Sequence, residues 1–226
     1  ADGQEVRSLG ILAPAEPPNW EGSEDWPFAV RAHRARAQLV ERGRVSLRFD
    51  ARKEDRYSHL LAHIYASNNG GAVWIQESLI AKGLARAVPQ PDLSACLVPL
   101  LAAEAEARAA RRGIWRSLSY QIRDAHNPTA LGYQRHIYQL VEGQVYGIGE
   151  GKKRIYINIG EDWRQDFTIV IARKRLPVLE ADGLDLPSLP GRRIRVRGWV
   201  EWWNGPMIEI SHAQEIEALD AVPRAE

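Results

Sequence analysis

The stretch that decides the fold is residues 5–15, which read Glu-Val-Arg-Ser-Leu-Gly-Ile-Leu-Ala-Pro-Ala. Its β-branched and apolar residues predict a strand over residues 4–12. Prolines at positions 14, 17 and 18 follow, and a cluster of prolines is typical of a loop. The stretch therefore predicts a strand followed by an exposed loop that reaches Trp26.

The rest of the first half predicts helices and strands in alternation. Apolar residues at helical spacing indicate an amphipathic helix from Pro27 to Gly43, because proline suits the first turn of a helix and glycine suits its end. Further elements follow: strands at 45–49, 60–65 and 73–75, a turn at 68–71, a short helix at 76–82 that stops at Gly83, and a long helix that Asp92 or Ser94 can cap and that Gly113 ends.

The second half predicts strands almost throughout. Residues 117–134 are irregular, and we interpret them as a linker. After them, tight turns at 147–151 and 204–205 and one weak helical pattern at 176–189 separate five β-branched or alternating segments, at 137–145, 154–159, 166–171, 192–200 and 206–210. Five short strands with one helical insertion fit a small OB-type barrel.

The composition is that of a globular protein and excludes several classes. Of the 226 residues, 45% are hydrophobic and 26% are charged, so extensive disorder is not expected. The formal net charge is only +1, so a surface for nucleic acid must come from local clustering of basic residues. A single cysteine, Cys96, allows no internal disulfide, and we expect it to be buried on a helix. No apolar run approaches the roughly 18 residues of a membrane span.

Three stretches together resemble the staphylococcal nuclease (thermonuclease) family, in the form found in bacteria. Besides residues 5–15, they are residues 45–65, with Asp-Arg-Tyr-Ser-His at 55–59, and residues 74–85 with the long helix that follows. The resemblance covers residues 4–115 and implies a mainly β protein with helices. It implies a nuclease-type OB-fold barrel at 1–116, whose first hairpin we expect to be missing from this chain, a linker at 117–134 and a second, smaller OB-like β-barrel at 135–219.

The chemistry of this family indicates what each substitution in these motifs changes. It is Ca²⁺-assisted phosphodiester cleavage, in which aspartates hold the ion, a glutamate activates water and two arginines clamp the phosphate. By resemblance Arg7 is the first arginine, whereas Leu12 replaces a metal-binding aspartate, Ala15 the glutamate and His59 the second arginine. A leucine cannot bind Ca²⁺ and an alanine cannot take a proton. We therefore expect no cofactor, and Ca²⁺ only if the site has been rebuilt.

The candidates left for catalysis are Arg7, His59 and Glu16, which lies one residue beyond the expected glutamate. A protonated His59 can donate a hydrogen bond to a phosphate. The alternative is that His59 is a polar residue at the mouth of the barrel and Glu16 a solvated loop carboxylate. Asp50 and Asp55 match positions that flank the family's site, and both also fit ordinary turn chemistry.

Residues for binding are retained better than residues for catalysis. Arg56 and Tyr57 match a basic residue and a tyrosine that contact a terminal phosphate in the family, and we expect Arg86 to continue the basic rim. Val88 and the proline that follows it stand where the family carries aromatic residues, which puts its base-stacking platform in doubt.

The second half carries basic and aromatic residues of its own. Arginines at alternate positions of one strand point to the same face, and cations interleaved with exposed aromatics suit single-stranded nucleic acid. The alternative is that the arginines pair with Glu201, Glu209 or Asp162 while the tryptophans build the core or a protein interface. The candidates for binding are Lys153, Arg154, Trp163, Arg193, Arg195, Arg197 and Trp202.

Three functions are consistent with these patterns. The preferred one is a catalytically degenerate thermonuclease-like protein that binds nucleic acid or another polyanion. The second is an active nuclease with a remodelled site, and the third is a non-enzymatic protein-interaction module. The partners to expect are DNA or RNA, or a protein bound through the C-terminal domain, and the family resemblance suggests a periplasmic or secreted location.

Overall fold

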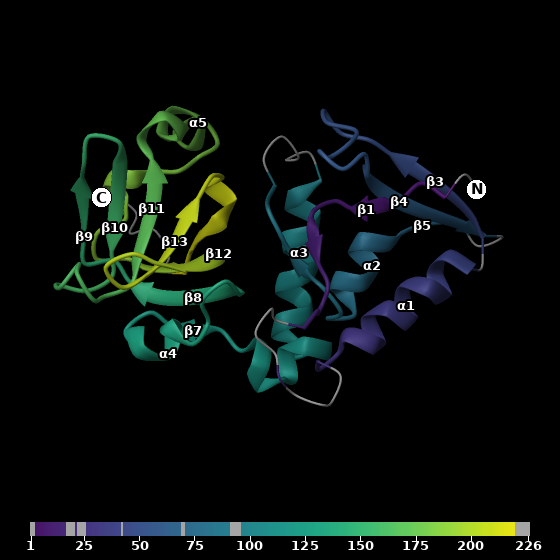
Figure 1. Ribbon diagram of the computed structural model, residues 1–226, viewed down its shortest axis with the longest axis horizontal. Coiled ribbons are helices and arrows are strands. Elements are labelled where there is room, and N and C mark those ends of the chain that lie inside the picture. The colour runs from purple at the N-terminus through teal and green to yellow at the C-terminus, as the bar shows by residue number, and fades with distance from the viewer. Residues whose placement is uncertain are drawn as a thin grey trace, which may run out of the picture. The chain divides into compact units, whose positions relative to one another are not determined.

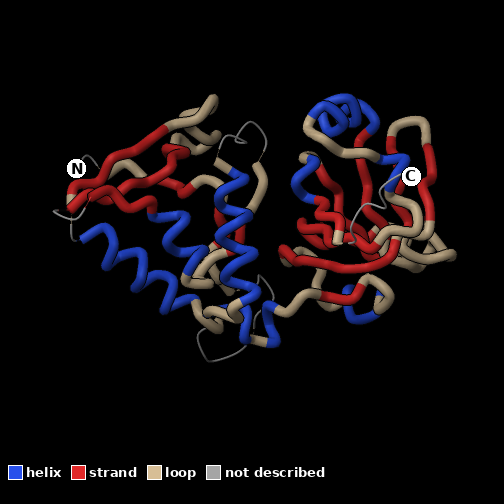
Figure 2. The backbone as a smooth tube through the Cα atoms, turned by 180° about the vertical axis from the view of Figure 1, so that it is seen from behind, coloured by secondary structure: helices blue, strands red, loops and turns tan. Residues whose placement is uncertain are grey.

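A computed structural model of the chain describes residues 3–16, 21, 26–41, 43–68, 71–90 and 96–219, except for the side chain of Asn68. The chain divides into two compact units, Ala1–Gln121 and Ile122–Glu226. Helices and strands both contribute heavily to the first unit, whereas strands dominate the second (Figures 1 and 2). No helix among the described residues is both long and apolar enough to cross a membrane.

Strand β4 (Leu60–Asn68) is the centre of the first unit's main sheet. It pairs in parallel with β1 (Val6–Ser8) and antiparallel with β3 (Arg44–Arg48) and β5 (Gly71–Trp74). The four strands form an open sheet, so the closed barrel predicted for this half is not found among the described residues. Strand β3 forms one edge, and β1 and β5 pair with successive parts of β4 along its other side.

The strand predicted over residues 4–12 is divided in two, which corrects that prediction. After β1, Gly10 takes a φ of +73° and turns the chain, a conformation that glycine adopts without steric cost. The next segment, β2 (Ile11–Leu12), then pairs with β6 (Arg86–Ala87) in a separate two-stranded ladder. The predicted loop continues to Glu16, and its remainder before Trp26 lies mostly outside the described residues.

Three helices cover the first unit's sheet. They are α1 (Ala29–Glu41), α2 (Ile75–Ala81) and α3 (Leu97–Ala109), close to the predicted ranges. The proposed caps of α3, Asp92 and Ser94, lie outside the described residues. Cys96 is half-buried just before α3 rather than within it. The core combines apolar side chains from both layers, among them Ile64, Ile75, Leu79, Ile80 and Leu100.

The second unit is built on one long, curled sheet, in which α5 (Leu176–Ala181) follows β11. The strand order is β7-β8-β12-β13-β11-β10-β9, with β14 beside β12 and with β11 parallel to β13. The bounds are β7 Arg123–Asp124, β8 Tyr138–Gln144, β9 Gly147–Glu150, β10 Arg154–Asn158, β11 Thr168–Ala172, β12 Arg193–Trp202, β13 Pro206–Ile210 and β14 Ile216–Ala218. Short 3₁₀ turns occupy Gly113–Arg116, Leu118–Tyr120, Arg173–Arg175, Leu186–Ser188 and Ala213–Glu215.

A bend at Val145 and Tyr146 determines how this sheet curls. Strands β8 and β9 lie toward opposite ends of the strand order in the sheet, yet only these two residues separate them in the chain. The Val145 N–H donates to the carbonyl of Arg192, and the Tyr146 N–H donates to the carbonyl of Asn158. The two residues therefore bond to segments at different places in the sheet. The ladders among the described residues form an open path, and the predicted closed ring is not found.

Two predictions for the second half need correction. Residues 147–150 are strand β9 and not a tight turn, because they pair with β10. Part of the predicted linker is structured: β7 pairs with β8, and Asn127 caps the helix α4 (Pro128–Gly132) by accepting from Ala130. Leu131 and Ala125 enter the second unit's core, which explains why this segment folds with that unit.

Candidate functional site

Arg7 and His59 meet at a shared carboxylate in the first unit. Because β1 and β4 are parallel and pair Arg7 with Leu61, the residues that precede the two strands also lie side by side. Asp55 Oδ2 lies 3.2 Å from Arg7 Nη1 and 2.9 Å from His59 Nδ1. His59 Nε2 lies 3.0 Å from Glu5 Oε2. The two predicted residues are thus brought together by carboxylates that the prediction did not pair with them.

The loop 55–59 presents these groups through a tight turn. One carboxylate oxygen of Asp55 accepts from the backbone N–H groups of Tyr57 and His59, at 2.8 and 3.1 Å. Ser58 takes a φ of +62°, a left-handed conformation that residues other than glycine adopt rarely. Asp55 therefore performs the turn chemistry expected of it and also holds Arg7 and His59.

The hydrogen bonds around Asp55 change its acidity. Partial burial raises the pKa of this carboxyl, but the hydrogen bonds from the His59 side chain and from the N–H groups of Tyr57 and His59 outweigh it. The pKa of Asp55 falls from 3.8 to about 2. Asp55 is therefore an anion at all ordinary pH values, and it neutralises part of the positive charge of Arg7.

We expect the Asp55 carboxyl to titrate near pH 2 in the folded protein. Because this pKa is below the ordinary 3.8, the stability that the carboxylate contributes is fully present above about pH 4 and is lost as the pH falls through about 2. A carbon-detected NMR titration of the side-chain carboxyls measures the midpoint. His59→Ala removes the strongest of the lowering contacts and should move the midpoint toward 3.8, and an unchanged midpoint in this variant would contradict the account.

Arg56 and Tyr57 form an exposed platform beside this network. The Arg56 guanidinium lies 4.7 Å from the centre of the Tyr57 ring, and that ring lies 5.9 Å from the ring of His59. Tyr57 is 60% exposed, and the Arg7 side chain is 57% exposed. The Arg7 guanidinium has further N–H donors besides the one that faces Asp55. This surface can therefore bind an anion.

The remaining motif positions do not supply the groups for calcium. Leu12, on β2, is half-buried and pairs with Arg86 across the ladder; its side chain has no oxygen. Ala15 and Glu16 are exposed, and no bond joins Glu16 to Arg7 or His59. The carboxylates beside Arg7 are already bonded to Arg7 and His59, and the described residues contain no cluster of three metal-binding side chains. The side chains of Leu12 and Ala15 therefore offer no oxygen ligand for a Ca²⁺ ion.

Arg86 does not continue a basic rim, which corrects that prediction. It is 6% exposed, and its guanidinium lies 5.2 Å from the centre of the Tyr120 ring. Strand β6 is held inside the unit because Glu104, which is wholly buried, accepts from the Ala87 N–H at 2.9 Å. Pairing of β6 with β2 turns Arg86 inward.

The three arginines of β12 are paired with carboxylates, as the alternative interpretation anticipated, although with other partners. Arg195 bonds Glu142 at 2.6 Å and Glu217 at 2.7 Å, and Arg193 bonds Glu142 at 2.8 Å. Arg197 is 3% exposed and lies 4.0 Å from Glu217. Arg195 is not available to a phosphate, because antiparallel pairing with β8 and β14 puts Glu142 and Glu217 opposite it. Arg197 is not available because it is buried.

The other predicted residues of the second unit lie at its surface. Lys153 is exposed in the β9–β10 turn, Arg154 begins β10, and Trp163 and Trp202 are half exposed. Trp203 and Tyr156 are exposed beside them, and Tyr156 was not predicted as a site residue. Alternation along β10 was the signal that could have shown Tyr156 on the outer face, since its neighbours Ile155 and Ile157 are buried.

Comparison with known families adds one finding. Residues 5–117 match the family model described as "Staphylococcal nuclease homologue". No curated protein matches the chain.

Proposed function

The chain belongs to the staphylococcal nuclease family, and from this premise we propose that it is a catalytically degenerate member that binds nucleic acid or another polyanion. It retains the family's means of gripping a phosphate and lacks the means of cutting beside it. The observation that carries the proposal is the Arg7–Asp55–His59 network, in which the nearby carboxylates serve protein cations instead of a metal ion.

Catalysis by the family's route needs a metal-bound phosphate and a base for water. Leu12 and Ala15 occupy the positions that would supply a ligand and that base. Asp55 is held as an anion by its hydrogen bonds, and a carboxylate with a pKa of about 2 is a weak base. These observations support binding without Ca²⁺-dependent cleavage.

Binding uses groups that are exposed. Arg7 and Arg56 supply guanidinium donors that suit phosphate oxygens. Tyr57 offers an aromatic face and a hydroxyl next to Arg56. The surface defined by Arg7, Arg56, Tyr57 and His59 therefore fits a strand of phosphates better than a small neutral ligand.

We propose in addition that the second unit is OB-like. The order β8-β12-β13-β11-β10-β9, with β8 and β9 consecutive in the chain and α5 between β11 and β12, supports this assignment. OB-type units commonly bind oligonucleotides on one sheet face, which is consistent with a function in polyanion binding for the chain as a whole.

The proposal is tested by binding and cleavage of the same labelled single-stranded oligonucleotide. We expect anisotropy to show binding that weakens with salt, and no cleavage with either Ca²⁺ or EDTA. Arg56→Ala should weaken binding and reduce the slope of log K against log salt by about 0.7, the value for one phosphate contact on a single strand.

Arg36→Ala is the matched control, because Arg36 is an exposed arginine of α1 outside the Arg7 network. It should leave the slope unchanged. Cleavage in Ca²⁺ that stops with EDTA would show an active, remodelled nuclease. Absence of binding at low salt would favour a module that binds protein instead.

A further inference from the structure

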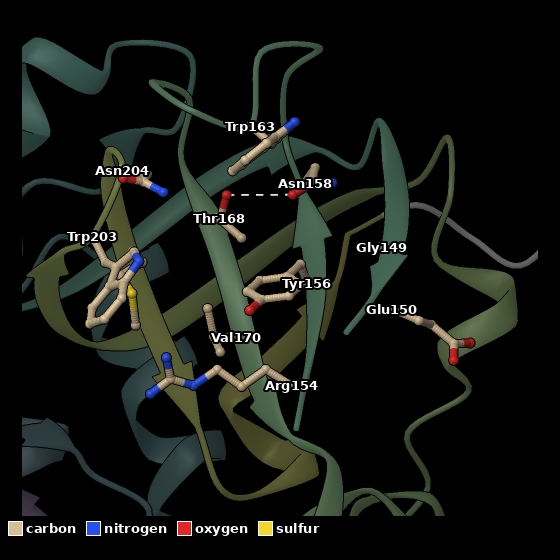
Figure 3. A pocket seen from close by; sticks show the side chains of 11 residues that line it. Gly149, Glu150, Arg154, Tyr156, Asn158, Trp163, Thr168, Val170, Trp203 and Asn204 are labelled. Atoms are coloured by element: carbon tan, nitrogen blue, oxygen red, sulfur yellow. Dashed lines mark hydrogen bonds between the residues drawn. The ribbon is translucent and has the colours of Figure 1, made fainter. Parts of the chain in front are cut away.

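A hollow on the outer face of the second unit's sheet has the character of a ligand site. Its volume is about 390 Å³, within the range of roughly 300–1,000 Å³ for ligand pockets. Residues of β9, β10, β11 and β13 form it, together with the loops that carry Trp163 and Trp203 (Figure 3). None of these residues belongs to the Arg7 network in the first unit.

Aromatic side chains stand around this hollow. Figure 3 shows Tyr156 in the middle, with Trp163 beyond one side of it and Trp203 beyond another. They are 36%, 50% and 69% exposed, and Met207 contributes to the lining beside them. Exposed aromatic rings that gather in one patch are typical of a binding surface, and aromatic rings stack favourably on other rings.

Cations accompany the rings. The Arg154 guanidinium lies 5.7 Å from the centre of the Trp203 ring, and the Arg164 guanidinium lies 4.4 Å from that of Trp163. The β9–β10 turn adds Lys152 and Lys153, and the Arg173 N–H donates to the Lys153 carbonyl. The basic run 173–175 is therefore beside the basic run 152–154.

Carboxylates near the hollow neutralise only part of this charge. Glu150 bonds Arg173 at 2.5 Å, and its side chain points away from the hollow in Figure 3. Glu209 lies 3.9 Å from Arg154. Asp162 accepts from Gln165 and from the Arg164 N–H. The lysines and the basic run leave a local positive excess that the overall charge of +1 conceals.

A second hollow adjoins the first and suggests a chain-like ligand. Trp203 and Asn204 line both hollows, and the second adds Trp202, Arg164 and Gln165. The β12–β13 turn is thus a shared wall, and aromatic and basic groups continue on its far side. A small molecule would fill one hollow, whereas a polymer with repeated rings and charges can use both.

We propose that this aromatic groove, lined by Tyr156, Trp163, Trp202, Trp203 and Arg154, binds single-stranded nucleic acid by stacking its bases. Rings that stack on bases and cations that follow the phosphates are the two elements of such sites. Amide and hydroxyl groups of Asn158, Thr168 and Asn204 also line the groove, where they can bond base edges. A duplex is excluded, since its bases are already stacked on one another.

The test compares two oligonucleotides of equal length by anisotropy, one with bases and one abasic, with the full chain. Trp203→Ala and Tyr156→Ala should each weaken binding of the base-bearing strand about fivefold or more and leave the abasic strand unchanged. Tyr133→Ala is the control, because Tyr133 is 77% exposed and lines neither hollow. Circular dichroism shows that each variant is folded.

The two strands keep this inference separate from the proposed function. Arg56→Ala acts on phosphates and should weaken both strands, so binding of the base-bearing strand alone would support the groove even if the Arg7 surface binds nothing. Equal affinity of Trp203→Ala and the unaltered protein for the base-bearing strand would overturn the inference. The inference would also be overturned if a proline-rich peptide bound at Trp203 and the oligonucleotide did not displace it.

Discussion

Gly113→Ala should unfold the first unit far more readily, lowering its free energy of unfolding by about 3–5 kcal/mol. Gly113 has a φ of +51°, and a Cβ there would lie 2.0 Å from the Gly83 carbonyl oxygen. That oxygen accepts from the Ile114 N–H at 2.8 Å. The end of α2 and the chain after α3 therefore meet through backbone alone, and a methyl group would force them apart.

The measurement is urea unfolding followed by hydrogen exchange, which reports the two units separately. Gly191→Ala is the matched control: Gly191 has a φ of +79°, but a Cβ there meets nothing within 4 Å. It should cost only the backbone strain, about 1–2 kcal/mol. Equal losses in the two variants would show that the contact with Gly83 does not matter.

Glu104→Ala should cost the first unit about 3–5 kcal/mol, which is typical when one partner of a buried charged pair is removed. Glu104 is wholly buried, accepts from the Ala87 N–H at 2.9 Å and lies 3.5 Å from Arg108 Nη1. Its removal leaves a buried N–H without this acceptor and a cation without this anion. Strand β6, which pairs with β2, should then lose protection from hydrogen exchange first.

Two variants of the same helix give the comparison. Glu104→Gln keeps an oxygen for the Ala87 N–H, so it should lose less than Glu104→Ala. Glu106→Ala changes an exposed carboxylate of α3 and should stay within about 0.5 kcal/mol of the unaltered protein. If Glu104→Ala behaved like Glu106→Ala, burial of the carboxylate would not be what holds β6.

The first unit's elements follow from local sequence patterns to a large extent. Helix α1 and strand β4 lie close to the ranges expected from helical spacing and β-branched residues, because both signals are local. The strand over 4–12 is the exception, since Gly10 turns the chain toward a partner, β6, that lies more than seventy residues further along. No local pattern reveals such a partner.

Sequence patterns predicted only part of the candidate site. The motifs identify Arg7 and His59, but the carboxylates of Asp55 and Glu5 that bond them depend on the register between β1 and β4. Arg86 shows the opposite case, since its residue type indicates an exposed cation while its strand partner buries it. The aromatic groove joins residues of several strands and loops, so alternation along any single strand shows only a part of it.

The sequence by itself determined the family and most of the order of helices and strands, because these depend on which residues are present and on their spacing. Tertiary structure alone decided which charges meet. Arg195 is bonded to Glu142 and Glu217, while Arg154 lies over Trp203. Strand register and turn geometry bring these groups together from distant positions, and an arginine has the same letter in the sequence whether it faces a glutamate or a ligand.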